Sequence, residues 1–121
     1  MFKKFNPNPC GKKVGDCVVR GLSLFLNKSW NDVYTDICLV GLKMCDLPNS
    51  NAVWHKYLLD SGYTCRIVEP ITVEQFCIEY PKGKYLLATG THVIAVEDGD
   101  YFDAWNSGSE NIFYYYTKEE E

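Results

Sequence analysis

The chain lacks any long hydrophobic run, and this argues against a membrane-spanning protein. The apolar stretches in its 121 residues are only a few residues long, whereas a bilayer-spanning helix needs about 20. The lysines at positions 3 and 4 are followed by no apolar segment, so we expect no secretory signal peptide. The sequence therefore predicts no membrane partner.

Cysteine is too sparse and too irregularly spaced for a disulfide-stapled scaffold or a zinc-binding motif. The chain has 6 cysteines in 121 residues, fewer than a disulfide-stapled scaffold contains. No two of them form a C-x-x-C pair, which excludes the usual zinc-knuckle and thioredoxin motifs. We expect free thiols in a reducing, cytoplasmic compartment, with no metal and no cofactor.

Basic residues are also in deficit. Lys and Arg number 12 against 16 Asp and Glu, which gives a net charge of −4. The nearest approach to a basic patch is the set of lysines at 3, 4, 12 and 13, and these are too few to neutralise a phosphate backbone. The composition therefore argues against nucleic acid as a partner.

What the chain does have is enough apolar sequence for one folded domain. Hydrophobic residues make up 46% and aromatic residues 15%, and a chain of this size buries somewhat over ~60% of its unfolded surface. We interpret residues 1–121 as a single domain. Residues 1–15, which include Asn-Pro-Asn-Pro at 6–9, are predicted to form an extended N-terminal loop, and residues 118–121 a frayed tail.

Helix signals occupy the first half of the chain and strand signals the second half. Asp16, Ser29 and Ser50 are helix N-cap residues followed by apolar residues at helical spacing, and Thr72 begins a shorter helix. Strands are predicted over 64–69, 85–88, 93–96, 101–105 and 112–116. This order predicts an α+β fold in which N-terminal helices pack on a C-terminal antiparallel sheet.

Cys17 is the cysteine whose position favours reactivity. It follows Asp16 at the first position of a predicted helix, where free amide N–H groups and the helix macrodipole favour negative charge. A thiol in such a place has a lowered pKa and therefore a larger thiolate fraction at neutral pH. The other five cysteines lie within predicted helices, a strand or a loop, and we interpret them as packing residues.

His92 is the candidate partner of this thiol, because it begins a predicted strand at the rim of the sheet. A two-residue turn at Asp98-Gly99 places His92 and Asp103 on one face of the hairpin, as diagonal neighbours. Asp103 would then orient the imidazole. A one-residue bulge would instead bring Asn106 opposite His92; of the two, we favour Asp103.

Three segments resemble papain-like cysteine peptidases: GDCVVR at 15–20, GTHVIAV at 90–96 and YFDAW at 101–105. The likeness is strongest to the small bacteriocin-processing (double-glycine leader) peptidases and their phage-borne relatives. In that family a Cys opens the central helix, a His begins a strand of the following sheet, and an Asp or Asn on the next strand orients the His. The resemblance implies a papain-like fold with Cys17 as nucleophile, His92 as base and Asp103 as orienter.

The sequence departs from this family at the oxyanion hole. Papain-like enzymes carry a Gln several residues before the Cys, and that place is held here by Gly11. Asn6 and Asn8 are candidates to supply an amide from the loop instead, together with the backbone N–H of Cys17.

Two further residues are candidates for substrate binding. Arg20 lies one turn after Cys17 and is placed to bind a substrate carboxylate, although we favour an ion pair with an acid of the helix. Trp105 lies beside the proposed catalytic residues, and lining a cleft and packing in the core are equally open to it.

The leading hypothesis is a cysteine peptidase, or a related acyl-transfer hydrolase, that acts on a peptide or isopeptide bond of a peptide or protein substrate. The alternative is a catalytically silent papain-like binding module, for example a phage or mobile-element protein that acts on a host factor. A third hypothesis is a transferase that moves an acyl or glutamyl group to an amine. The missing Gln favours the binding module, and the order Cys, His, Asp favours an enzyme.

Overall fold

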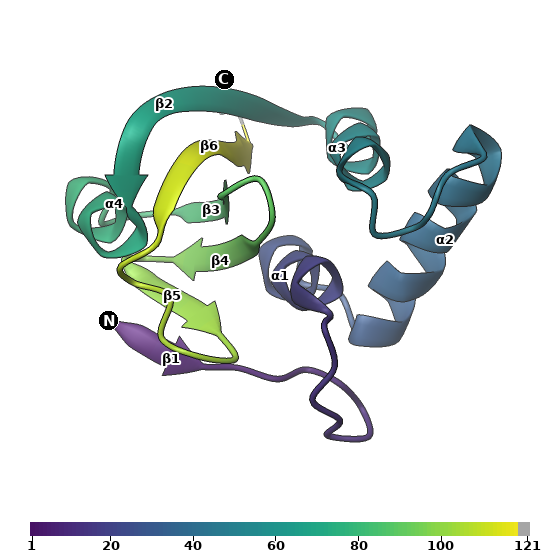
Figure 1. Ribbon diagram of the computed structural model, residues 1–121, viewed down its shortest axis with the longest axis horizontal. Coiled ribbons are helices and arrows are strands. Elements are labelled where there is room, and N and C mark those ends of the chain that lie inside the picture. The colour runs from purple at the N-terminus through teal and green to yellow at the C-terminus, as the bar shows by residue number, and fades with distance from the viewer. Residues whose placement is uncertain (119–121) are drawn as a thin grey trace.

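The computed structural model describes residues 1–118, and over these residues the chain is α+β, with four helices and a six-stranded mixed sheet (Figure 1). The helices are α1 (Cys17–Leu26), α2 (Trp30–Met44), α3 (Asn51–Asp60) and α4 (Val73–Glu79). The strands are β1 (Phe2–Lys4), β2 (Tyr63–Thr72), β3 (Lys84–Ala88), β4 (Val93–Glu97), β5 (Asp100–Asp103) and β6 (Asn111–Lys118). Of the tail predicted over 118–121, Lys118 is the last residue of β6, and residues 119–121 lie outside the described part.

Helix starts follow the predicted N-cap positions, but only two of the four caps use their side chain. The Ser29 hydroxyl accepts from the Asp32 N–H, and the Thr72 hydroxyl accepts from the Gln75 N–H. Asp16 precedes α1 as predicted, yet its side chain makes no capping hydrogen bond. Ser50 likewise makes none at the start of α3. The first-turn amides of α1, next to Cys17, therefore lack the usual side-chain acceptor.

The hairpin between β4 and β5 has the predicted register. Glu97 pairs with Asp100, and Ala95 pairs with Phe102. The turn residues Asp98 and Gly99 both have positive φ, 49° and 81°, which is the backbone that a tight two-residue hairpin turn requires. The two-residue turn is confirmed, and it brings the end of β5 back toward the start of β4.

The sheet has the order β1-β5-β4-β3-β6-β2, and its first strand corrects two predictions. Residues 1–15 are not all loop, because Phe2–Lys4 forms a strand, and the sheet is not wholly antiparallel, because that strand pairs in parallel with β5. The pairing is supported by Phe2, whose ring lies 5.7 Å from the ring of Tyr101. A three-residue strand is too short to show a hydrophobic period in the sequence.

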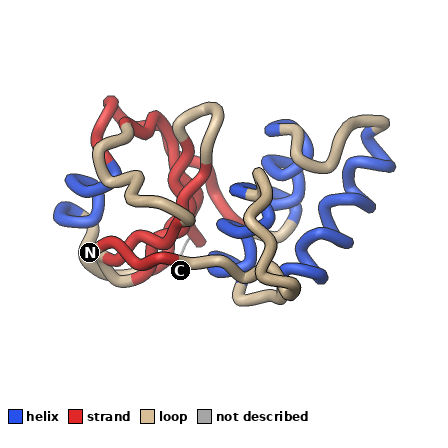
Figure 2. The backbone as a smooth tube through the Cα atoms, turned by 60° about the horizontal axis from the view of Figure 1, so that its bottom comes forward, coloured by secondary structure: helices blue, strands red, loops and turns tan. Residues whose placement is uncertain are grey.

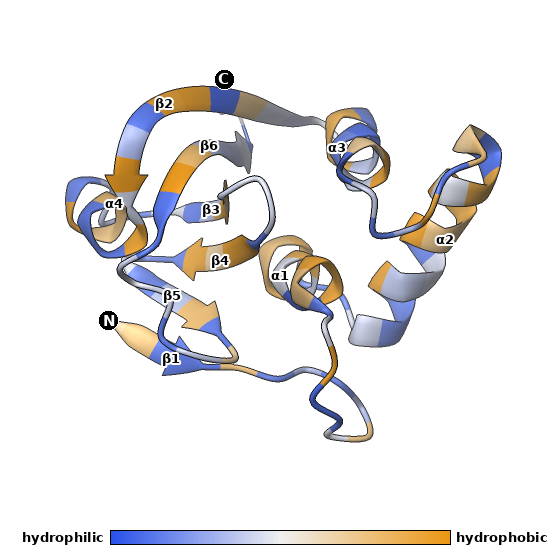
Figure 3. Ribbon diagram, in the orientation of Figure 1, coloured by the Kyte–Doolittle hydropathy of each residue, from blue (hydrophilic) through white to orange (hydrophobic). Residues whose placement is uncertain are grey.

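The two faces of the sheet are covered by different helices (Figures 1 and 2). Helices α1, α2 and α3 gather on one side and α4 lies on the other, so alternate residues of β3 and β4 face different clusters. Leu86, Ala88, Val93 and Ala95 pack with α1 and α3, while Leu87, Ile94 and Val96 pack with α4. This burial on both faces explains the nearly continuous apolar colour of β4 in Figure 3. None of the helices described is long and apolar enough to cross a membrane.

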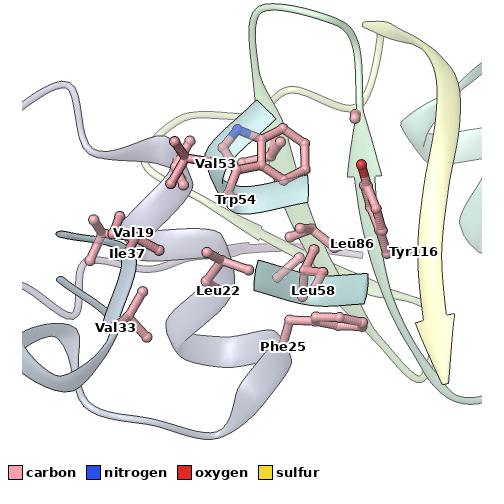
Figure 4. Close-up of a cluster of buried hydrophobic side chains, with 14 residues drawn as sticks. Val19, Leu22, Phe25, Val33, Ile37, Val53, Trp54, Leu58, Leu86 and Tyr116 are labelled. Atoms are coloured by element: carbon pink, nitrogen blue, oxygen red, sulfur yellow. The ribbon is translucent and has the colours of Figure 1, made fainter. Parts of the chain in front are cut away.

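Helix α1 lies close to the sheet because Gly21 has no side chain. A Cβ at this position would be 3.0 Å from Leu86 Cδ1 and 3.4 Å from Val93 Cγ2. The close approach brings the middle of α1 against Leu86 of β3 and against Val93, the first residue of β4. Leu22, Phe25 and Trp54 then fill the layer between the helices and the sheet (Figure 4).

We expect Leu22→Ala to lower the free energy of unfolding by about 2–5 kcal/mol, because the side chain is fully buried and its removal leaves a cavity. Leu42→Ala is the matched control, since Leu42 is also helical but 75% exposed. We expect this control to change stability by less than about 0.5 kcal/mol. Urea unfolding monitored by circular dichroism measures both, and equal losses would show that α1 does not form the core as described.

Candidate active site

The structure brings Cys17, His92 and Asp103 together at the junction of α1 with the sheet. Cys17 is the first residue of α1, His92 immediately precedes β4, and Asp103 is the last residue of β5. His92 Nε2 lies 2.7 Å from Asp103 Oδ2, and Cys17 and His92 lie close enough that each shifts the pKa of the other. Three segments far apart in the sequence therefore meet through the packing of α1 on β4 and the register of the β4–β5 hairpin.

Asn106, the other candidate orienter, is not beside His92. Its Oδ1 accepts from the Tyr101 hydroxyl at 2.8 Å and from the Gly108 N–H at 3.0 Å. Because the hairpin has no bulge, Asn106 lies past the end of β5 and stabilises the turn that follows. The structure thus places Asp103, and not Asn106, against the imidazole.

Asp103 is a completely buried carboxylate with four hydrogen-bond partners. Besides His92, its Oδ2 accepts from the Ser107 hydroxyl at 2.7 Å. Its Oδ1 accepts from Arg20 at 2.9 Å and from the Ala104 N–H at 2.8 Å. Burial raises the pKa of Asp103, but the hydrogen bonds from His92 and Ser107 outweigh burial and lower it overall. The group is therefore ionised at neutral pH.

His92 has the opposite shift. Burial lowers the pKa of its imidazole, but the hydrogen bonds and charges of Asp103 and Cys17 raise it overall to about 9. Since Nε2 is held by Asp103, Nδ1 is the ring nitrogen left for the thiol. One face of the ring is covered by Trp105, whose ring is stacked at a centroid distance of 4.5 Å. Trp105 is itself 51% exposed. It therefore shields one face of His92 from the surface of the protein and is not a core residue.

The thiol of Cys17 is made acidic by the same neighbours. Burial raises its pKa, but hydrogen bonding to His92 and to the Val93 backbone, with the charges of His92 and Arg20, lowers it overall. By contrast, burial raises the pKa of Cys65, and that of Cys77 to about 11. A lowered thiol pKa beside a raised imidazole pKa favours a thiolate–imidazolium pair around neutral pH.

Arg20 lies behind this pair, with its guanidinium bound to two carboxylates. Its guanidinium donates to Asp16 Oδ1 at 2.6 Å and to Asp103 Oδ1 at 2.9 Å, and the residue is 5% exposed. The ion pair with an acid of its own helix, which the sequence favoured, is confirmed at Asp16. Both forks of Arg20 are occupied, so its side chain is not open to bind a substrate carboxylate.

Two residues of this site were missed at the sequence level. Ser107 supplies a hydroxyl to Asp103, but it lies in a turn with no pattern that points to the site. Trp30 donates its indole N–H to Asp16 Oδ2 at 2.8 Å. The four-residue spacing of Asp16 and Arg20 predicts an ion pair between them. The hydrogen bond from Trp30 to Asp16 could not be predicted, because it depends on how the next helix packs.

Neither Asn6 nor Asn8 faces Cys17. Asn6 Nδ2 donates to the Lys12 carbonyl, while Asn8 Oδ1 accepts from the backbone N–H groups of Cys10 and Lys12. Both amides therefore stabilise turns within their own loop. The free first-turn amides of α1, including that of Cys17, are the donors nearest the thiol in the helix that carries it.

A cavity of about 470 Å³ opens beside Cys17 and His92. Its walls come from α1, α2, α3, β6 and the start of β4 with the turn before it. They are mainly aromatic and aliphatic: Trp30, Tyr34, Ile37, Trp54, Val93 and Tyr114. Asp16 also borders it, but that carboxylate is already bound by Arg20 and Trp30. The cavity therefore offers an apolar surface next to the thiol.

Comparisons of the chain with protein-family models, with curated proteins and with solved structures found no match. Among the residues that the structure describes, no group of three or more His, Cys, Asp or Glu is arranged to hold a metal ion.

We expect Cys17 to react with iodoacetamide ahead of the other five thiols at pH 6.5. Its pKa is lowered, so its thiolate fraction exceeds that of an ordinary thiol, which is only about 1% at this pH. Peptide mass mapping after a brief treatment measures the labelling. His92→Ala should slow the reaction at Cys17 and shift its pH profile upward; an unchanged profile would mean that the two side chains do not interact.

We expect Asp103→Ala to lower the pKa of His92 from about 9 toward its ordinary value, because the imidazolium loses its principal anionic partner. Asn106→Ala is the matched control and should leave this pKa unchanged, since Asn106 contacts Tyr101 and Gly108. Titration of the ring protons by NMR measures both variants. A larger effect from Asn106→Ala would contradict the register described here.

Proposed function

We propose that this protein is a cysteine hydrolase that acts on a peptide or isopeptide bond. The observation that carries the proposal is the linear order of Cys17, His92 and Asp103, in which one imidazole is bonded to a buried carboxylate and lies next to a thiol whose pKa it lowers. This arrangement gives a nucleophile, a general base and an orienting group their required contacts. A structural histidine needs no acidified thiol beside it.

The reaction proceeds in two balanced steps. The Cys17 thiolate attacks the substrate carbonyl carbon, the carbon–nitrogen bond breaks, and the His92 imidazolium gives its proton to the departing amine. Neutral His92 then takes a proton from water as that water attacks the thioester, the carbon–sulfur bond breaks, and the thiolate is restored. Asp103 keeps Nε2 occupied throughout, so that Nδ1 stays directed at the reacting groups.

The arrangement of elements supports a papain-like relationship. A helix that begins with the cysteine packs on a sheet whose strands carry the histidine and then the aspartate. A free-thiol protein with six unpaired cysteines also suits a reducing, cytoplasmic compartment. The oxyanion would be stabilised by first-turn backbone amides of α1, which have no side-chain cap.

The apolar cavity indicates which kind of substrate side chain would bind next to the cleaved bond. Its aromatic walls, provided by Trp30, Tyr34 and Trp54, suit an uncharged side chain or acyl chain close to the scissile carbonyl. A charged side chain would lose much of its hydration against these walls, which is costly. We therefore infer a peptide or protein substrate with an apolar residue next to the cleaved bond.

A binding module without catalysis is the second candidate, and one observation favours it. The loop that would supply a side-chain amide to the oxyanion hole holds Gly11 in place of Gln, and its Asn6 and Asn8 are committed to their own turns. Such a protein would keep the apolar cavity and bind a partner segment without cleaving it.

The test is acylation of the thiol by p-nitrophenyl esters, followed by digestion of a peptide library with mass-spectrometric detection of cleavage. We expect a burst of nitrophenolate and an acyl group on Cys17, with hexanoyl esters reacting faster than acetyl esters. His92→Ala should slow acylation by about 10²–10⁴-fold, and Cys17→Ala should abolish it. Cys38→Ala is the control that keeps full activity. Acylation without turnover of any peptide would favour the binding module.

A further inference from the structure

Behind the proposed catalytic residues lies a buried row of charges whose signs do not cancel. Asp16, Arg20 and Asp103 are 9%, 5% and 0% exposed, and the guanidinium bridges the two carboxylates. Two anions thus share one cation in the interior. A buried excess of negative charge is costly unless another positive group lies within reach.

The positive group within reach is His92, at the far oxygen of Asp103. If Arg20 paired with Asp103 alone, it would cancel the charge of that carboxylate and leave little to attract a proton to the imidazole. Asp16 prevents this, because it takes one fork of Arg20 through a contact of 2.6 Å. Trp30 holds the other oxygen of Asp16 at 2.8 Å.

We propose that Asp16 and Arg20 are positioning residues for His92, in which Arg20 fixes Asp103 and Asp16 balances the charge of Arg20 so that Asp103 remains an effective anion for the imidazole. This inference rests on the proposed function, since it assigns the two residues to the set-up of the catalytic base. Neither residue touches the reacting bond.

The local geometry of α1 favours this role over an ordinary cap. Asp16 occupies the N-cap position, yet its carboxylate makes no capping hydrogen bond and is directed to Arg20 and Trp30. A carboxylate placed only to start a helix would accept from the first-turn amides. Turning it away leaves those amides free beside Cys17.

Few titratable groups face His92 from the elements packed around it. Asp103 is bonded to the ring, and Cys17 lies next to it. Arg20 of α1 and the N-cap residue Asp16 lie behind Asp103, and Tyr34 and Tyr114 line the adjoining cavity. From α3, His55 is held by the Tyr116 hydroxyl at 2.6 Å. A change in the proton affinity of His92 can therefore be traced to a small set of residues.

The test measures proton binding by His92 through NMR titration of its ring in full-length protein that carries Cys17→Ser, so that the thiol does not titrate in the same range. Asp16→Asn removes an anion and should weaken proton binding about tenfold. Arg20→Gln removes a cation and should strengthen it. The double variant restores the balance of charge and should return the proton affinity to nearly its starting value.

These signs separate charge balance from mere loosening of the structure. If Asp16 and Arg20 only held the fold together, both single variants would move His92 toward its ordinary pKa, and the double variant would move it furthest; that result would overturn the proposal. If Arg20→Gln fails to fold, the comparison of Asp16→Asn with the double variant still decides. A double variant that does not recover would then count against charge balance.

The exposed ion pair of Lys56 with Asp60 provides the matched control. It has the same spacing of four residues on a helix, but its side chains are 53% and 64% exposed. Asp60→Asn and Lys56→Gln should leave the titration of His92 unchanged. The titration needs no substrate, so it is independent of the test of the proposed function. If the expected pKa shifts occur but ester acylation fails, the proposed function is refuted while the charge balance of Asp16, Arg20 and Asp103 is supported.

Discussion

The carboxylate of Asp103 is ionised and has no exposure to water, and its hydrogen bonds join α1 to the β4–β5 hairpin and to the turn that follows. Such a group stays charged in a protein interior only if hydrogen bonds replace its lost hydration. Four donors do so here, and they come from α1, the turn before β4, Ala104 and Ser107. Satisfying this one residue therefore requires the helix, the hairpin and the following turn to meet at a single point.

The sheet edge contributes to the same requirement. Lys4 of β1 pairs with Asp103, and the Phe5 N–H donates to the Asp103 carbonyl at 2.9 Å. The backbone of Asp103 is thus fixed by β1 on one side, while its side chain is fixed by Arg20 on the other. Gly21 allows α1 to come close enough for this second contact. Strand β1 and helix α1 are thus both held in place by contacts with Asp103.

Local signals predicted most of this fold, because helix caps and a tight turn act within a few residues. Ser29, Thr72 and the Asp98-Gly99 turn behave as their sequence indicates, and the turn alone determines that residue 103 returns to residue 92. Strand β1 could not be predicted, because three residues show no period and their partner lies about a hundred residues away. The same holds for Ser107 and Trp30, whose roles depend on contacts between elements. The prediction that Asn6 or Asn8 supplies an amide beside Cys17 was wrong. Short polar side chains in loops form hydrogen bonds with the nearby backbone, and both residues do so here.

The charged row also bears on why this interior is polar at all. Replacing a buried ion pair by apolar residues of similar volume is often neutral or stabilising, whereas removing one partner costs about 3–5 kcal/mol. Stability alone would therefore favour an apolar contact between α1 and β5, next to the large core formed by Leu22, Phe25 and Trp54. The structure instead has a row of charged side chains there, which runs from Asp16 through Arg20 to Asp103. The row continues to the imidazole of His92, next to Cys17. Under the proposed function this polar interior has an explanation, because a nucleophilic thiol requires a neighbouring cation that keeps its proton until the leaving group departs.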